Sequence, residues 1–224
     1  MTLPLRIPFH ISGRAKPHSQ LYFGLCAKAL LEYRSLVSQL NRLDSMKPEY
    51  DGVYALANEA SIKPIVFGAM CVESTLFDLS ATLFDERYAS KIDRMPPPER
   101  FAALAERIDR EVPKPDLAVV KAISDLFAAR KRLIHYKSKS MINQDWNELL
   151  DEYREDHKIH MRGIDSSFRA PVLLSIHFDG NIFENLRILP SFKLPEYWEA
   201  AIPPELHDDV RECIKEGGEQ RNAA

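Results

Sequence analysis

The sequence predicts an all-α protein. Apolar residues recur at three- and four-residue steps over several long stretches, which is the spacing of a helix with one apolar face. The 224 residues include only 8 Gly against 15 Pro, which disfavours a glycine-rich sheet protein and glycine-rich phosphate loops. Apolar residues make up 45% and charged residues 28% of the chain, as in a soluble domain that buries a core without disulfide or metal crosslinks.

The first twenty residues are expected to form an extended arm. Leu5, Ile7, Phe9 and Ile11 alternate with other residues, which suits a short strand. Pro8 would confine that strand to the edge of a sheet, because proline has no N–H to donate.

Helical spacing then predicts a series of helices, at 20–44, 53–60, 62–88, 98–110, 115–138 and 144–160. The helix at 62–88 is given Ser61 as its N-cap and has Pro64 in its first turn. It is apolar on most sides, which places it in a core or at a subunit interface. A last amphipathic helix begins at Pro203-Pro204 and ends at Gly217-Gly218.

The C-terminal part contains the one predicted β-hairpin. Residues 172–178 (VLLSIHF), followed by Asp179-Gly180, indicate a strand and a tight turn, with a return strand through Ile188. No composition shift marks a linker. We therefore expect a helical domain with its N-terminal arm over residues 1–164, and a C-terminal extension at 165–224 packed on it.

Cysteine usage and hydropathy indicate the compartment. Cys26, Cys71 and Cys213 are odd in number and widely spaced, which argues against a disulfide framework and a zinc site. The longest apolar run, at 65–72, has eight residues, whereas a bilayer span needs roughly 20. The N-terminus lacks the apolar core of a signal peptide. We expect a cytoplasmic protein that has no membrane contact, metal or cofactor.

Charge is unevenly distributed along the chain. The net charge is −3, which excludes a globally basic nucleic-acid-binding surface but not a local basic patch. The segment from Lys121 to Lys139 carries +5, and the segment 145–156 carries −5. Charge alone favours two antiparallel helices that neutralise each other.

Arg130 and His135 lie within the basic segment and could act on RNA without a metal. A guanidinium binds two phosphate oxygens and stabilises the charge of the transition state. An imidazole can remove the proton of the 2′-OH or protonate the leaving oxygen. Arg130 and His135 are five residues apart, so on one helix they point ~140° away from each other. Two such helices packed about a two-fold axis would share one cleft, which predicts a homodimer.

The same residues resemble the RX4–6H motif of HEPN domains. The string DLFAARKRLIHYK contains RX4H and is similar to the motif helix of that family, and FGAMCVESTLFDLSATLFDERY, with Glu73, resembles the preceding core helix. The similarity spans residues 62–138. It implies a helical bundle, dimerisation, and often metal-independent endoribonuclease activity, as in toxins with antitoxin partners, phage defence and RNA processing.

The resemblance assigns roles to individual residues. Arg130 would stabilise the phosphate and His135 would be the acid/base, while the neighbouring polar side chains would bind RNA: Lys131, Arg132, Tyr136 and Lys137. The chain departs from the family at Lys131, where the residue after the Arg is usually polar, most often Asn. Many HEPN domains are inactive binding modules, so a silent module that binds RNA, a nucleotide or a partner protein is the alternative function. Without the family, His135 would be interpreted as a group that caps helix carbonyls.

Three further groups have a structural and a functional interpretation. Glu73 faces an apolar side, so it needs a partner or must take up a proton. A structural salt bridge or a hydroxyl contact is favoured, and the functional alternative is that Glu73 orients Arg130 or His135. Asp156 and His160 are one turn apart and could share a metal, although a solvated helix face is favoured. Aromatic residues of the C-terminal third could stack on RNA bases, although packing onto the bundle is favoured: Phe168, Phe178, Phe183, Phe192, Tyr197 and Trp198.

Overall fold

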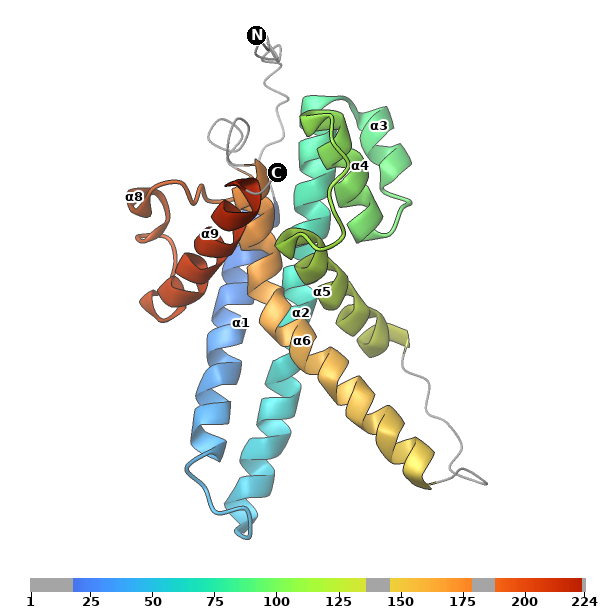
Figure 1. Cartoon of the computed structure of the whole chain (residues 1–224). Coiled ribbons are helices and arrows are strands. Elements are labelled where there is room, and N and C mark those ends of the chain that lie inside the picture. Colours follow the sequence, from blue (N-terminus) through green and yellow to red (C-terminus); the bar gives the residue numbers. More distant parts are fainter. Residues whose placement is uncertain (1–17, 136–145, 179–187, 223–224) are drawn as a thin grey trace.

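The computed structural model describes the backbone of residues 18–135, 146–178 and 188–222, and their side chains except at residues 135 and 219–222. The predicted N-terminal strand lies outside these ranges. Within them the protein is all-α and has no strand, as predicted (Figure 1). Its elements are α1 (His18–Leu40), α2 (Pro48–Leu83), α3 (Glu86–Ile92), α4 (Pro97–Asp109), α5 (Ala118–His135), α6 (Trp146–Phe178), α8 (Pro195–Trp198), the 3-10 helix η1 (Pro204–Leu206) and α9 (His207–Asn222).

Helix α2 joins two helices that the sequence predicts as separate. It runs unbroken through Ser61, which therefore does not cap a helix but donates its hydroxyl to the carbonyl of Asn58 at 2.6 Å. Pro64 lies inside the helix and is buried. Proline removes one backbone hydrogen bond from a helix. Burial of the residues on both sides of Pro64 outweighs this cost, so the helix continues through it.

The predicted β-hairpin is wrong in its first strand. Residues 172–178 form the last turns of α6, which runs continuously from Trp146 through Gly163 and Pro171 to Phe178. Val172, Leu174 and Phe178 are buried in the core. An apolar run of this length suits a buried helix as well as a strand, and packing on several sides selects the helix. The predicted turn at Asp179-Gly180 and most of the return strand lie outside the described residues.

Helix α3 is absent from the sequence prediction. Its N-cap is Asp85, whose carboxylate accepts a hydrogen bond from the backbone N–H of Tyr88 at 2.6 Å. This contact supplies one of the donors that a helix N-terminus leaves unpaired. The helix is one short element between α2 and α4, and its seven residues are too few to show a hydrophobic period.

The core lies where α1, α2, α5 and α6 pack together (Figure 1). Two glycines allow the closest approaches. A Cβ at Gly68 on α2 would lie 2.3 Å from the carbonyl oxygen of Ser167 on α6, and a Cβ at Gly163 on α6 would lie 2.1 Å from the Cβ of Ala129 on α5. Pro171 lacks the N–H that would bind the Ser167 carbonyl within α6, and this carbonyl faces the bare Cα of Gly68.

Helix α2 is long and apolar enough to cross a membrane by length and composition. Half of its most apolar 18-residue window is buried inside the fold. A core helix meets the same criterion of length and composition, because it is apolar on most of its sides. The span does not form one uninterrupted apolar run in the sequence, because Glu73 and Asp78 divide the apolar residues of α2.

Candidate functional site

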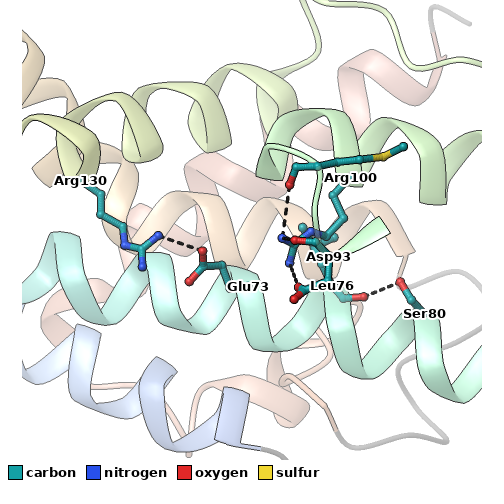
Figure 2. Close-up of polar contacts among 7 residues, drawn as sticks. Glu73, Leu76, Ser80, Asp93, Arg100 and Arg130 are labelled. Carbon is teal, nitrogen blue, oxygen red and sulfur yellow. Dashed lines mark hydrogen bonds and ion pairs between the residues drawn. The ribbon is translucent and has the colours of Figure 1, made fainter. Parts of the chain in front are cut away.

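Arg130 is held on the surface by an ion pair between two helices. Its Nη1 on α5 donates to Oε1 of Glu73 on α2 at 2.8 Å, and Figure 2 shows the guanidinium reaching across to that carboxylate. The side chains of Arg130 and Glu73 are 29% and 32% exposed. An arginine has five N–H donors, so this contact leaves capacity to bind an anion. Arg130 is thus the partner of the Glu73 carboxylate in the structure.

A second arginine in Figure 2 shows what a structural arginine looks like in this fold. The side chain of Arg100 on α4 is 6% exposed and lies 2.6 Å from the Asp93 carboxylate. It also donates to the carbonyls of Asp93 at 2.6 Å and Met95 at 3.3 Å. Arg100 thus fastens the α3–α4 turn, whereas Arg130 remains within reach of solvent.

The opposite charges of α5 and α6 neutralise each other in part, as predicted. Arg132 on α5 lies 3.2 Å from Asp156 on α6, and further along the pair Asp125 on α5 lies 4.0 Å from Arg162 on α6. Moving along α5 from Asp125 to Arg132, the paired residue on α6 changes from Arg162 to Asp156. Residue numbers thus increase in opposite directions, and the two helices are antiparallel. Arg132 keeps 52% exposure of its side chain, and exposed pairs of this kind contribute little to stability.

The structure places the other predicted site residues only in part. His135 is the last residue of α5, five residues after Arg130 along the helix. Its side chain, together with Tyr136 and Lys137, lies outside the described parts of the chain. Lys131 is exposed on α5. The described residues thus bring Arg130 to Glu73, and Arg132 to Asp156, at the basic end of α5.

Asp156 and His160 contact different partners. The Nε2 atom of His160 lies 2.7 Å from the hydroxyl oxygen of Ser61 on α2, and Asp156 faces Arg132. In the described parts of the chain, no group of three or more His, Cys, Asp or Glu side chains could hold a metal ion. Burial, and to a lesser degree the charge of His157, lowers the pKa of His160, so its imidazole is neutral at pH 7.

The cysteines are core residues. Cys26, Cys71 and Cys213 are fully buried. Burial raises the pKa of Cys26 and of Cys213 to about 12, and it raises that of Cys71 well above its usual value. A thiol must ionise to act as a nucleophile, so none of the three is a nucleophile at neutral pH.

Most C-terminal aromatic residues pack the core, as favoured from the sequence. Phe168, Phe178, Phe192 and Trp198 are at most 3% exposed, so they offer no face to a base. Tyr197 is 50% exposed, and Phe183 lies outside the described residues.

The structure reveals two surface features that the sequence pattern does not indicate. Trp146, Leu150 and Tyr153 lie in the first half of α6 and are 68%, 45% and 65% exposed. A cavity of about 340 Å³ also opens between α1 and α2, beside the ion pair of Lys63 with Glu32 at 2.8 Å. Helical spacing identifies an apolar face, but it does not show whether another element covers that face.

Comparison of the chain with protein-family models, curated proteins and solved structures gave no match.

Proposed function

We propose that this protein is a metal-independent endoribonuclease of HEPN type that acts in the cytoplasm as a homodimer. The observation that supports the proposal is the Glu73–Arg130 ion pair, which holds a partly exposed guanidinium at 2.8 Å from its carboxylate on the helix that ends in His135. A guanidinium that is fixed at one nitrogen and accessible at the others can receive a phosphate without reorganising.

The proposed reaction uses the RNA's own 2′-OH as the nucleophile. His135 would accept the 2′-OH proton while the 2′ oxygen attacks the adjacent phosphorus, and a protonated His135 of the second subunit would donate to the leaving 5′ oxygen. The products are a 2′,3′-cyclic phosphate and a 5′-hydroxyl. Arg130 would bind the non-bridging oxygens, and Lys131, Arg132, Tyr136 and Lys137 would contact the neighbouring phosphates.

The alternative is a silent HEPN-like module that binds RNA, a nucleotide or a partner protein through the same surface. Glu73 and Asp156 favour it, because each places a carboxylate against one of the arginines, at 2.8 Å and 3.2 Å. Those carboxylates reduce the positive potential that a phosphate would meet.

Cleavage of a single-stranded RNA in EDTA separates the two functions. We expect wild type to cut, and both His135→Ala and Arg130→Ala to lose at least about a hundredfold in rate, the typical contribution of an acid/base or charge-stabilising group. Lys121→Ala is the matched control, because Lys121 is an exposed cation on the same helix, and it should cut normally. An RNA with a single 2′-deoxy residue at the cut site should resist cleavage there.

Three results of these experiments would contradict the endoribonuclease or its mechanism. Binding of RNA by wild type without any cleavage in EDTA or with divalent ions would favour the silent module. Cleavage that persists in His135→Ala would remove His135 from the mechanism. Sedimentation of the wild-type protein as a monomer at the concentrations that cleave RNA would refute the shared dimeric site.

A further inference from the structure

Helices α2 and α6 pack in a regular register and then separate. Ser61 contacts His160, 99 residues later, at 2.7 Å. Gly68 meets Ser167 with the same offset, seven residues further along both helices. Seven residues in the other direction, the register points to Tyr54 on α2 and Tyr153 on α6. Figure 1 shows the two helices diverging toward that end.

The diverging ends leave aromatic side chains uncovered. Tyr54 is 44% exposed and stacks on Tyr50, with ring centroids 6.1 Å apart, while Tyr153 and Trp146 are 65% and 68% exposed. Leu150 is 45% exposed. We call these five residues the aromatic faces. Exposed aromatic groups at helical spacing on two neighbouring helices are typical of a binding surface rather than of a solvated one.

The helix segments that carry the aromatic faces are acidic. Residues 48–60 and 146–158 together contain eight acidic and two basic side chains, a net charge of −6. Two further cations pair with these acids, Arg132 with Asp156 and Arg162 with Glu155, so the two segments and their partners carry −4. This potential repels RNA, whose phosphates are bound by cations. A second copy docked by its own aromatic faces would bring two surfaces of like, negative charge together, which disfavours that pairing.

We propose that the aromatic faces bind a basic amphipathic helix of a partner protein. Its apolar side chains, spaced at three and four residues, would pack between Tyr54 and Tyr153 and against Trp146. Lys and Arg on its flanks would face acids such as Glu148 and Asp151. The partner helix would continue the packed seam of α2 and α6 beyond Ser61 and His160.

The probe is a synthetic 18-residue helix of leucine and lysine with one apolar face, compared with a peptide of the same pattern that has glutamate in place of lysine. Of the two tryptophans, Trp198 is 1% exposed and Trp146 is 68% exposed. A blue shift of the tryptophan emission and reduced quenching by acrylamide therefore indicate that the peptide buries Trp146. We expect the lysine peptide to bind, with an affinity that falls at high salt, and the glutamate peptide not to bind.

Variants test whether binding occurs at this surface. Tyr153→Ala, and separately a Glu148→Lys/Asp151→Lys double variant, should weaken binding of the fluorescein-labelled lysine peptide at least tenfold by anisotropy. Tyr197→Ala is the matched control, because Tyr197 is 50% exposed on α8, and it should bind as wild type does. Three results would overturn the proposal. The variants could all bind the lysine peptide as tightly as wild type, or the glutamate peptide could bind as tightly as the lysine peptide. In the third result, acrylamide quenching of Trp146 falls as the concentration of the protein alone is raised. The last result would identify a second copy as the occupant.

Discussion

Replacing Gly68 with alanine should destabilise the protein by about 1–2 kcal/mol net, because it forces α2 and α6 apart. The added Cβ would lie 2.3 Å from the Ser167 oxygen, 2.9 Å from its carbonyl carbon and 3.0 Å from its Cα. Ordinary contacts of a Cβ begin at 3.4 Å, so the helices must separate by roughly 1 Å at a point where both sides are backbone and no rotamer can yield. Overpacking of this kind costs typically 1–3 kcal/mol, occasionally more.

The gain in helix propensity from Gly to Ala, about 1 kcal/mol, opposes this cost. Gly52→Ala measures that gain separately, because Gly52 is exposed on the same helix and an added Cβ would meet nothing within 4 Å. Urea unfolding followed by circular dichroism should show Gly52→Ala stabilised by about 0.5–1 kcal/mol and Gly68→Ala destabilised. Equal stabilisation of the two variants would refute the close approach of α2 and α6. As a second readout, loosening the adjacent Ser61–His160 contact should raise the pKa of His160 toward its ordinary value, as measured by NMR titration.

Two further predictions concern the packing around α6. Gly163→Ala should destabilise the fold by about 1–2 kcal/mol net of the gain in helix propensity, because its Cβ would lie 2.1 Å from the Cβ of Ala129. In urea unfolding, adding Ala129→Gly should recover most of the overpacking cost, whereas simple addition of the two effects would contradict the contact. The second prediction is pH dependence: burial lowers the pKa of His160 below its ordinary 6.5, so between these two values the unfolded state binds the proton more readily and stability falls as the pH falls below 6.5. The difference in unfolding free energy between pH 7.5 and 5.5 should shrink in His160→Asn, and an unchanged difference would show that His160 does not contribute.

The sequence predicted the fold class and several helices because hydrophobic period is a local property. The helix expected at 98–110 is observed at Pro97–Asp109, and the one expected at 115–138 is observed at Ala118–His135. The errors occur where local and tertiary signals conflict. Pro64 and Pro171 are local break signals, yet both lie inside long helices. Burial of the surrounding residues decides these positions, and burial depends on neighbours distant in sequence.

The candidate site was predictable in its chemistry but not in its pairing. A carboxylate on an apolar face requires a partner, which made Glu73 a candidate site residue. The sequence offered both Arg130 and His135 as groups that it could contact. The contact depends on how α2 lies against α5, a relation that no local pattern contains. The exposure of Trp146 and Tyr153 could not be predicted for the same reason, since it results from the divergence of α2 and α6.

Complete burial of all three thiols has a practical consequence for experiments on this protein. Alkylating reagents and disulfide reagents can reach Cys26, Cys71 or Cys213 only when the helices around them open. Their modification rate therefore measures the opening of the core, without any added label. A single cysteine introduced at an exposed position would carry a spectroscopic probe selectively, because the native thiols react only through opening of the fold.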